Sequence, residues 1–193
     1  MRMIVFSALI SLLVFHHPTR AQTRPQLAVR LNQNNDIAFV RILYPELQVD
    51  LNGNGQLINT WNQLGEETLS LDYYDEFKGK EKQGKLKSMG STQIDYYDNF
   101  DGEARKGKVK RIGDITVDYY DRFDGILAGK IKSIGNQRIS YYDQFSGNEK
   151  KGKLKSVGSV QVEYYDRFDG NHRAGKIKSI TGNEQENVRI LFN

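Results

Sequence analysis

The residues best suited to chemistry recur five times between residues 71 and 181. Each copy carries Tyr-Tyr-Asp, then Phe-x-Gly, and then Gly-Lys-apolar-Lys. Tyrosine rings can stack on sugar faces, while carboxylates and ammonium groups hydrogen-bond hydroxyls. The pattern therefore favours a repeated ligand platform. Its candidate binding residues are the second tyrosine of each pair and the second lysine of each copy: Tyr74, Tyr97, Tyr120, Tyr142, Tyr165, Lys87, Lys110, Lys132, Lys155 and Lys178.

The same residues have a purely structural interpretation. Carboxylates and lysines on adjacent strands form cross-strand pairs worth roughly 0.2–1 kcal/mol each. Lysine on outer strands also discourages aggregation through sheet edges. The sequence leaves both interpretations open.

Catalysis and metal binding find little support in the residue types. A catalytic site needs different groups that converge on one point, whereas this chain presents the same groups five times. His172 is the only histidine after residue 21, and it lies in a polar spacer, so no Ser-His-Asp triad is expected. The segment Asp50-Leu51-Asn52-Gly53-Asn54-Gly55 resembles the start of a calcium loop, but Trp61 stands where the closing glutamate belongs. We expect an Asn-Gly turn there, no catalytic residues, no metal site and no cofactor.

Each copy reads as two short strands. Ile94 to Phe100 is rich in β-branched and aromatic residues, Asp101-Gly102 marks a turn, and Gly107 to Gly113 forms the second strand. The first tyrosines are spaced by 23, 23, 22 and 23 residues, and the missing residue falls in the spacer from Gly125 to Gly129. The shorter spacer indicates a surface turn, where changes in length cost little.

Alternation along the strands assigns their faces. Ile94, Tyr96, Asp98 and Phe100 are expected on one face, and Tyr97 on the other, so that the core face carries a column of Tyr and Phe. Ile112 falls on the lysine face in this scheme, which predicts a bulge or a strand end before it.

The predicted fold class is all-β: tandem β-hairpin repeats that form a curled antiparallel meander or solenoid-like sheet, with a closed barrel or propeller as the alternative. Residues 22–70 contain three alternating segments and are expected to form an N-terminal β cap over the open edge of the first repeat. Residues 182–193 are expected to supply a C-terminal edge strand. There, Val188 to Phe192 echoes Val40 to Tyr44, which suggests either chance or two edge strands that close the sheet or pair between chains.

Residues 1–21 have the features of a signal peptide: Arg2, an apolar run from Ile4 to Phe15, and small residues at Thr19 and Ala21. The apolar run is too short to span a membrane, so no integral segment is expected after cleavage. Removal of the leader leaves a net charge of +2, which argues against a nucleic-acid partner. The chain has no cysteine, so it has no disulfide and no thiolate site. We expect export to the periplasm, the cell surface or the medium.

The segment from Gly152 to Gly158, followed by Val162 to Asp166, resembles the tyrosine–aspartate (YD) repeats of Rhs-type and teneurin-type surface proteins. The resemblance covers about 110 residues and departs in the additional Phe-x-Gly spacer. A weaker resemblance is to MORN repeats, which are β-hairpins of similar length. Both resemblances imply a binding or structural array, and neither carries catalytic residues over.

The sequence therefore predicts an exported, non-enzymatic structural or protein-interaction scaffold at the cell envelope. The alternative is a module that binds cell-wall or extracellular polysaccharide through the Tyr/Asp/Lys face. The expected partner is a protein or a polysaccharide, and self-association through edge strands is a further possibility.

Overall fold

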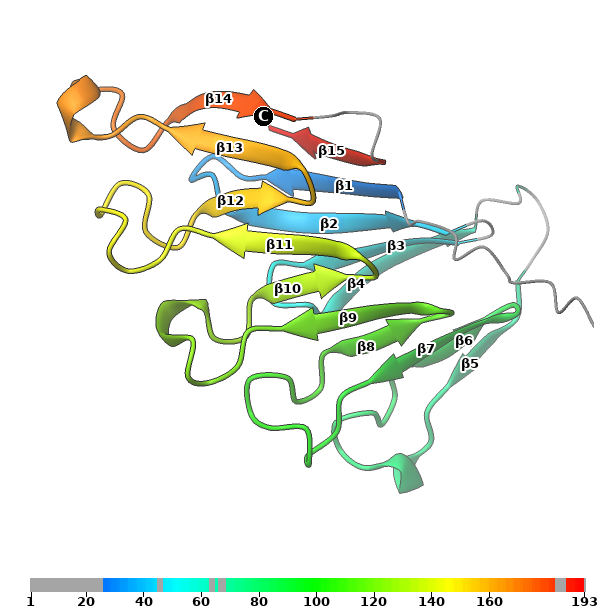
Figure 1. The fold of residues 1–193 in the computed structure, drawn as a ribbon. Helices are drawn as coiled ribbons and strands as arrows, with labels where there is room; N and C mark the ends of the chain where they lie inside the picture. Colours follow the sequence, from blue (N-terminus) through cyan, green and yellow to red (C-terminus); the bar gives the residue numbers. More distant parts are fainter. Residues whose placement is uncertain (1–25, 45–46, 63–64, 66–68, 183–186, 193) are drawn as a thin grey trace, which may run out of the picture.

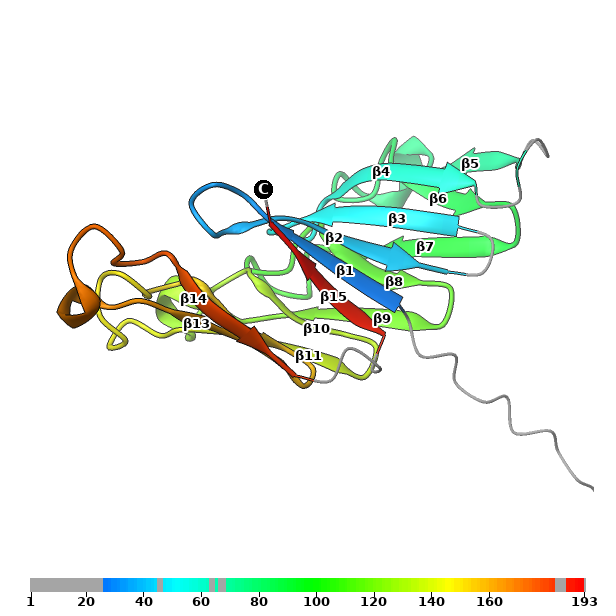
Figure 2. The same cartoon turned by 90° about the horizontal axis from the view of Figure 1, so that it is seen from above.

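The computed structural model describes residues 26–44, 47–62, 65, 69–182 and 187–192. Its strands form two open antiparallel-rich sheets that face each other (Figures 1 and 2). The larger sheet has ten strands in the order of the sequence, from β5 to β14, and the smaller has five in the order β15-β1-β2-β3-β4. The predicted all-β meander of tandem hairpins is confirmed, and the sheet does not close into a barrel.

The ten-stranded sheet contains two strands from each repeat, and consecutive strands pair in an antiparallel manner. A long loop joins the two strands of a repeat, and a tight turn at glycine leads to the next repeat. All five long loops lie along one edge of the sheet (Figure 1). The strands are β5 (Leu71–Tyr73), β6 (Leu86–Met89), β7 (Thr92–Tyr96), β8 (Val109–Ile112), β9 (Ile115–Tyr119), β10 (Ile131–Ile134), β11 (Gln137–Tyr141), β12 (Leu154–Val157), β13 (Val160–Tyr164) and β14 (Ile177–Thr181).

Short 3₁₀ turns lie within three of the long loops: η1 (Glu76–Lys78), η2 (Gly125–Leu127) and η3 (Arg167–Asp169). No helix in the described ranges is long and apolar enough to cross a membrane.

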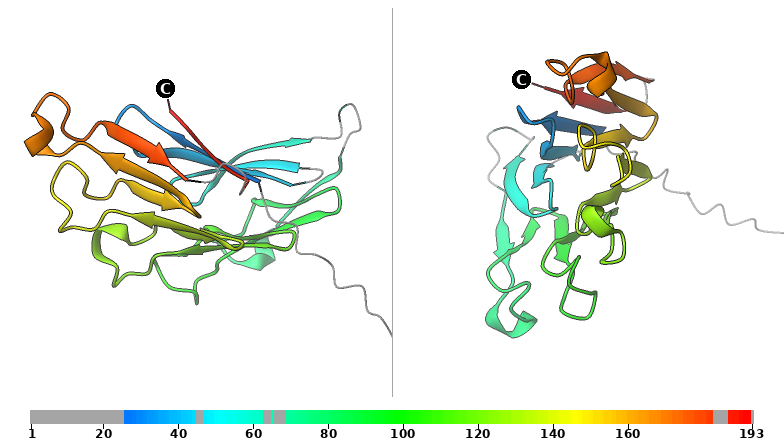
Figure 3. Two further views of the ribbon diagram at one scale, coloured as in Figure 1. Left: turned by 45° about the horizontal axis from the view of Figure 1, so that its top comes forward. Right: turned by 90° about the vertical axis from the view of Figure 1, so that its left-hand side faces the viewer.

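The N-terminal segment forms most of the smaller sheet: β1 (Gln26–Leu31), β2 (Ile37–Leu43), β3 (Leu47–Asn52) and β4 (Leu57–Asn62). This sheet lies over the apolar face of the repeats (Figure 3). The sequence predicts a cap over the edge of the first repeat instead, but β5 pairs only with β6 among the described strands. The two sheets pack face to face instead of edge to edge, because this arrangement buries the apolar residues of both sheets in one core.

The C-terminal strand β15 (Val188–Leu191) pairs in parallel with β1, from Leu27 opposite Val188 to Arg30 opposite Leu191. It is an edge strand, as predicted, but of the smaller sheet. The segment that it echoes is β2, which lies between β1 and β3, so the interpretation of both segments as edge strands is wrong for β2. The leader, residues 1–21, lies outside the described residues.

A bulge in each repeat corrects the simple alternation. The register between β7 and β8 shifts between Asp95 and Tyr96, so that both Val109 and Ile112 face the core. The bulge predicted from the position of Ile112 is therefore present, and its extra residue, Lys110, lies on β8 between Val109 and Ile112.

Candidate functional site

In the first four repeats, the second tyrosine of the pair reaches across to the following repeat. The Tyr97 hydroxyl donates to the Val117 carbonyl at 3.0 Å, and the ring packs edge-on against Tyr119 at a centroid distance of 5.8 Å. Tyr74, Tyr120 and Tyr142 do the same, with the carbonyls of Ile94, Ile139 and Val162 as acceptors. These tyrosines therefore join each repeat to the next.

The candidate lysines cover those rings. Lys110, Lys132, Lys155 and Lys178 place their ammonium groups 5.0–5.7 Å from the centroids of Tyr97, Tyr120, Tyr142 and Tyr165. Lys87 instead pairs with the carboxylate of Asp72 at 2.8 Å. Four of the five predicted lysines thus form cation–π contacts within their own repeat.

In the first four repeats, the first lysine of the Lys-x-Lys pair also bridges repeats. Lys108 lies over the Tyr119 ring at 5.1 Å, and its Nζ donates to the Gly129 carbonyl at 2.5 Å. Lys85, Lys130 and Lys153 donate to the equivalent glycine carbonyls. Burial lowers the pKa of all four lysines from the ordinary value of 10.5.

The sequence predicts an open column of second tyrosines, and the structure does not form one. Tyr97, Tyr120 and Tyr142 are less than one-tenth exposed, while Tyr74 and Tyr165 are half-buried. The hydrogen bonds of their hydroxyls, their edge-on tyrosine neighbours and the lysines above their rings explain the recurring Tyr-Tyr and Lys-x-Lys residues as packing between repeats. The structure therefore brings all ten predicted residues to one ladder but leaves few ring faces accessible for stacking.

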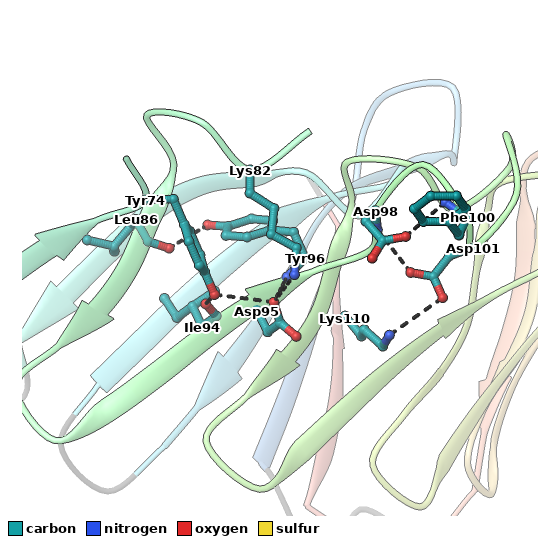
Figure 4. Close-up of polar contacts among 10 residues, drawn as sticks. All are labelled: Tyr74, Lys82, Leu86, Ile94, Asp95, Tyr96, Asp98, Phe100, Asp101 and Lys110. Carbon is teal, nitrogen blue, oxygen red and sulfur yellow. Dashed lines mark hydrogen bonds and ion pairs between the residues drawn. The ribbon is translucent and has the colours of Figure 1, made fainter. Parts of the chain in front are cut away.

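The invariant aspartate of each repeat ends the first strand. The Asp98 carboxylate accepts a hydrogen bond from the Phe100 backbone N–H at 2.8 Å (Figure 4). Its own N–H donates to Asp101, which also pairs with Lys110. Asp75, Asp121, Asp143 and Asp166 cap their loops in the same way. The backbone therefore turns at this position.

The phenylalanine that follows the capped turn points into solvent. Its side chain is 81–95% exposed in every copy: Phe77, Phe100, Phe123, Phe145 and Phe168. The expectation that these rings belong to the core face is wrong, because the strand ends before them and alternation no longer applies. The signal that identifies them is the Asp-x-Phe-x-Gly pattern, in which an aspartate cap precedes the ring and a turn glycine follows it.

The buried tyrosines are poor acids and bases near neutral pH. Burial is the main cause that raises the pKa of four of the first tyrosines: Tyr96, Tyr119, Tyr141 and Tyr164. Asp50, the acid of the calcium-loop pattern, forms an ion pair with Arg41 at 2.8 Å. The Asn52 side chain accepts two backbone N–H bonds in the predicted Asn-Gly turn.

Comparisons with protein-family models, with curated proteins and with solved structures found no match to this chain. The resemblances to YD and MORN repeats therefore remain predictions.

Proposed function

We propose that this protein is an exported, non-enzymatic scaffold that binds a protein partner at the cell envelope through a row of five phenylalanines. The row consists of Phe77, Phe100, Phe123, Phe145 and Phe168, and it follows the long-loop edge of the ten-stranded sheet. The observation that supports the proposal is the exposure of every one of these rings, from 81% to 95%. Exposed apolar side chains in a regular set are typical of interaction surfaces.

The geometry of the row suits an extended partner. Each repeat adds two strands, so successive rings are about 10 Å apart along the sheet. The aspartate caps fix the backbone beside each ring, so that little conformational entropy remains to be lost on binding. Aromatic anchors of this kind contribute most of the energy at protein interfaces.

A protein partner fits the row better than a polysaccharide does. Sugar recognition needs free polar groups beside the ring, to bond the hydroxyls. Beside Phe100, the carboxylates of Asp98 and Asp101 are already engaged with backbone N–H groups and with Lys110. The Tyr/Asp/Lys face, the site of the polysaccharide alternative, has its rings covered.

Photo-crosslinking in the producing cells tests the proposal. A photoreactive phenylalanine analogue replaces Phe100 or Phe123 in the row, and Asn136, an exposed residue in a tight turn at the opposite edge, is the matched control. We expect one discrete protein adduct from both row positions and none from Asn136. The adduct should disappear when the other four phenylalanines are changed to serine.

Two results would contradict the proposal. Equal adducts from Asn136 and from the row would indicate non-specific proximity. Co-sedimentation with cell-wall polysaccharide that is lost when the five phenylalanines become serine would instead assign the row to carbohydrate binding.

A further inference from the structure

The two outer strands of the ten-stranded sheet, β5 and β14, lie at its opposite ends (Figure 1). Leu71 and Tyr73 on β5 are 50% and 53% exposed. Their counterparts in the next repeat, Ile94 and Tyr96, are 0% and 2% exposed, because β6 pairs with the strand that carries them. The first repeat therefore presents a core surface that a preceding repeat would cover.

The last repeat presents the matching surface. In earlier repeats the second tyrosine donates to a carbonyl of the following repeat, and the first lysine donates to a following glycine carbonyl. Tyr165 and Lys176 occupy these positions in the fifth repeat, and among the described residues no acceptor is seen for either side chain. Lys176 is exposed, whereas its four counterparts are half-buried.

Charges follow a rule from repeat to repeat. A cation in the spacer pairs with an acid on the first strand of the following repeat: Lys82 with Asp95 at 2.7 Å, and Arg105 with Asp118 at 3.1 Å. The third spacer has Leu127 at this position, and the following repeat has Ser140 in place of the acid.

The fourth spacer has Lys150, and Glu163 follows it. At the ends of the array, Arg173 is a spacer cation with no following repeat, and Asp72 is a first-strand acid with no preceding one. The end of one copy therefore supplies a cation to the beginning of another, where Asp72 pairs with Lys87 of its own repeat at 2.8 Å and its carboxylate can accept from a second cation.

We propose that this protein associates head to tail with further copies of itself, with β14 of one copy pairing in an antiparallel manner with β5 of the next. The junction repeats the internal one. Tyr165 donates to the Leu71 carbonyl of the second copy, Lys176 donates to its Gly84 carbonyl, and Arg173 pairs with its Asp72. This inference concerns a different surface from the phenylalanine row and does not depend on the proposed function.

Such a contact joins two different surfaces, so it leaves a free end on every assembly and generates open chains rather than closed dimers. The internal register fixes the register of the junction. Ser88 lies opposite Gln93 and Met89 opposite Thr92 between the first two repeats. By equivalence, Ser179 of one copy lies opposite Ser70 of the next, with Cα atoms about 4.5–5.5 Å apart.

Charge reversal tests the direction of the contact. The purified proteins R173E and D72R should each sediment as monomers at concentrations where the unchanged protein forms a concentration-dependent series of oligomers. An equimolar mixture should recover that series, because the two variants then alternate and every junction joins opposite charges. One junction pairs the two substituted positions, and the next pairs the native Arg173 of the D72R protein with the native Asp72 of the R173E protein. The variant R122E, which changes an exposed loop charge away from both ends, should assemble like the unchanged protein.

Cysteine pairing tests the register, since the chain contains no cysteine of its own. Under mild oxidation, the double variant Ser70→Cys with Ser179→Cys should give a ladder of disulfide-linked multimers. Ser70→Cys with Lys178→Cys, which lies one residue out of register and on the opposite face, should give none. A protein that remains monomeric at every concentration would overturn the proposal. So would assembly that neither charge reversal weakens, or equal crosslinking by the two cysteine pairs.

Discussion

Tyr119 and Tyr141 occupy the same position in successive repeats, and their change to phenylalanine should have opposite effects on stability. Both rings are buried, at 0% and 7% exposure. The Tyr119 hydroxyl donates to the Val109 carbonyl at 2.7 Å, with the Gly55 carbonyl of the smaller sheet at 3.2 Å. The Tyr141 hydroxyl is buried and has no hydrogen-bond partner among the described residues.

The magnitudes follow from this difference. Tyr119→Phe removes a buried hydrogen bond and leaves a carbonyl unsatisfied, which should lower the free energy of unfolding by about 1–3 kcal/mol. Tyr141→Phe removes a hydroxyl that has lost its water without gaining a partner, and it should leave stability unchanged or raise it by about 1 kcal/mol. For a chain of this size, each kcal/mol shifts Tm by about 2–4 °C.

Guanidinium denaturation followed by the fluorescence of Trp61, the single tryptophan, measures both variants. The slope m should not change, since neither variant alters the surface exposed on unfolding. Tyr96→Phe and Tyr164→Phe provide an independent second pair, because Tyr96 donates to the Leu86 carbonyl and the Tyr164 hydroxyl is unpaired among the described residues. Equal losses within both pairs would refute the reasoning.

Three further predictions concern the same ladder. Gly55→Ala should destabilise the protein by several kcal/mol more than Gly102→Ala, as measured by denaturation. Both glycines have positive φ, but a Cβ at Gly55 would overlap the Tyr119 ring, whereas Gly102 faces open space. Lys108→Met should lower the free energy of unfolding by about 1–2 kcal/mol, because it removes a half-buried donor to a glycine carbonyl. Lys110→Met should lower it by less than about 1 kcal/mol, since only a cation–π contact and a long ion pair are lost. A larger fall in Tm for Lys110→Met than for Lys108→Met would contradict this assignment. The protein should unfold as the pH rises above about 10, because burial raises the pKa of the tyrosines and the folded state keeps protons that the unfolded state releases. Each fully protected tyrosine then lowers the free energy of unfolding by about 1.4 kcal/mol per pH unit. The buried lysines, whose pKa is lowered, oppose this loss, but they are fewer; tyrosinate absorbance that rises before the circular dichroism changes would count against the prediction.

The sequence was a reliable guide where one local pattern decides the structure. The period and the β-branched residues predicted the ten strands, and alternation correctly placed Ile94 and Tyr96 in the core. Alternation failed at Phe100, because the Asp98 side chain captures the backbone N–H of that residue and ends the strand. Side chain–backbone bonds of this kind compete with the sheet ladder and are not visible as hydrophobic periodicity.

The sequence did not predict the features of the fold that depend on packing between residues far apart in the chain. The three alternating segments of residues 22–70 predicted strands, but nothing local specified the parallel pairing of β1 with Val188 to Leu191 or the face that the smaller sheet covers. The second tyrosines were predicted as a set, yet their burial depends on contacts with the following repeat, as between Tyr97 and Tyr119. A repeated pattern thus predicts which residues are equivalent, but it does not predict how neighbouring copies cover one another.

The parallel pairing of β1 with β15 has a consequence for the order of folding. These strands are separated by about 160 residues, so the smaller sheet depends on one of the longest chain closures available to this protein. The hairpins of the repeats need only neighbouring residues and can form while synthesis continues, but β1 meets β15 only after all five repeats have been synthesised. The β1 side of the smaller sheet is therefore completed after the strands of the larger sheet, although β1 itself is the first strand to be made.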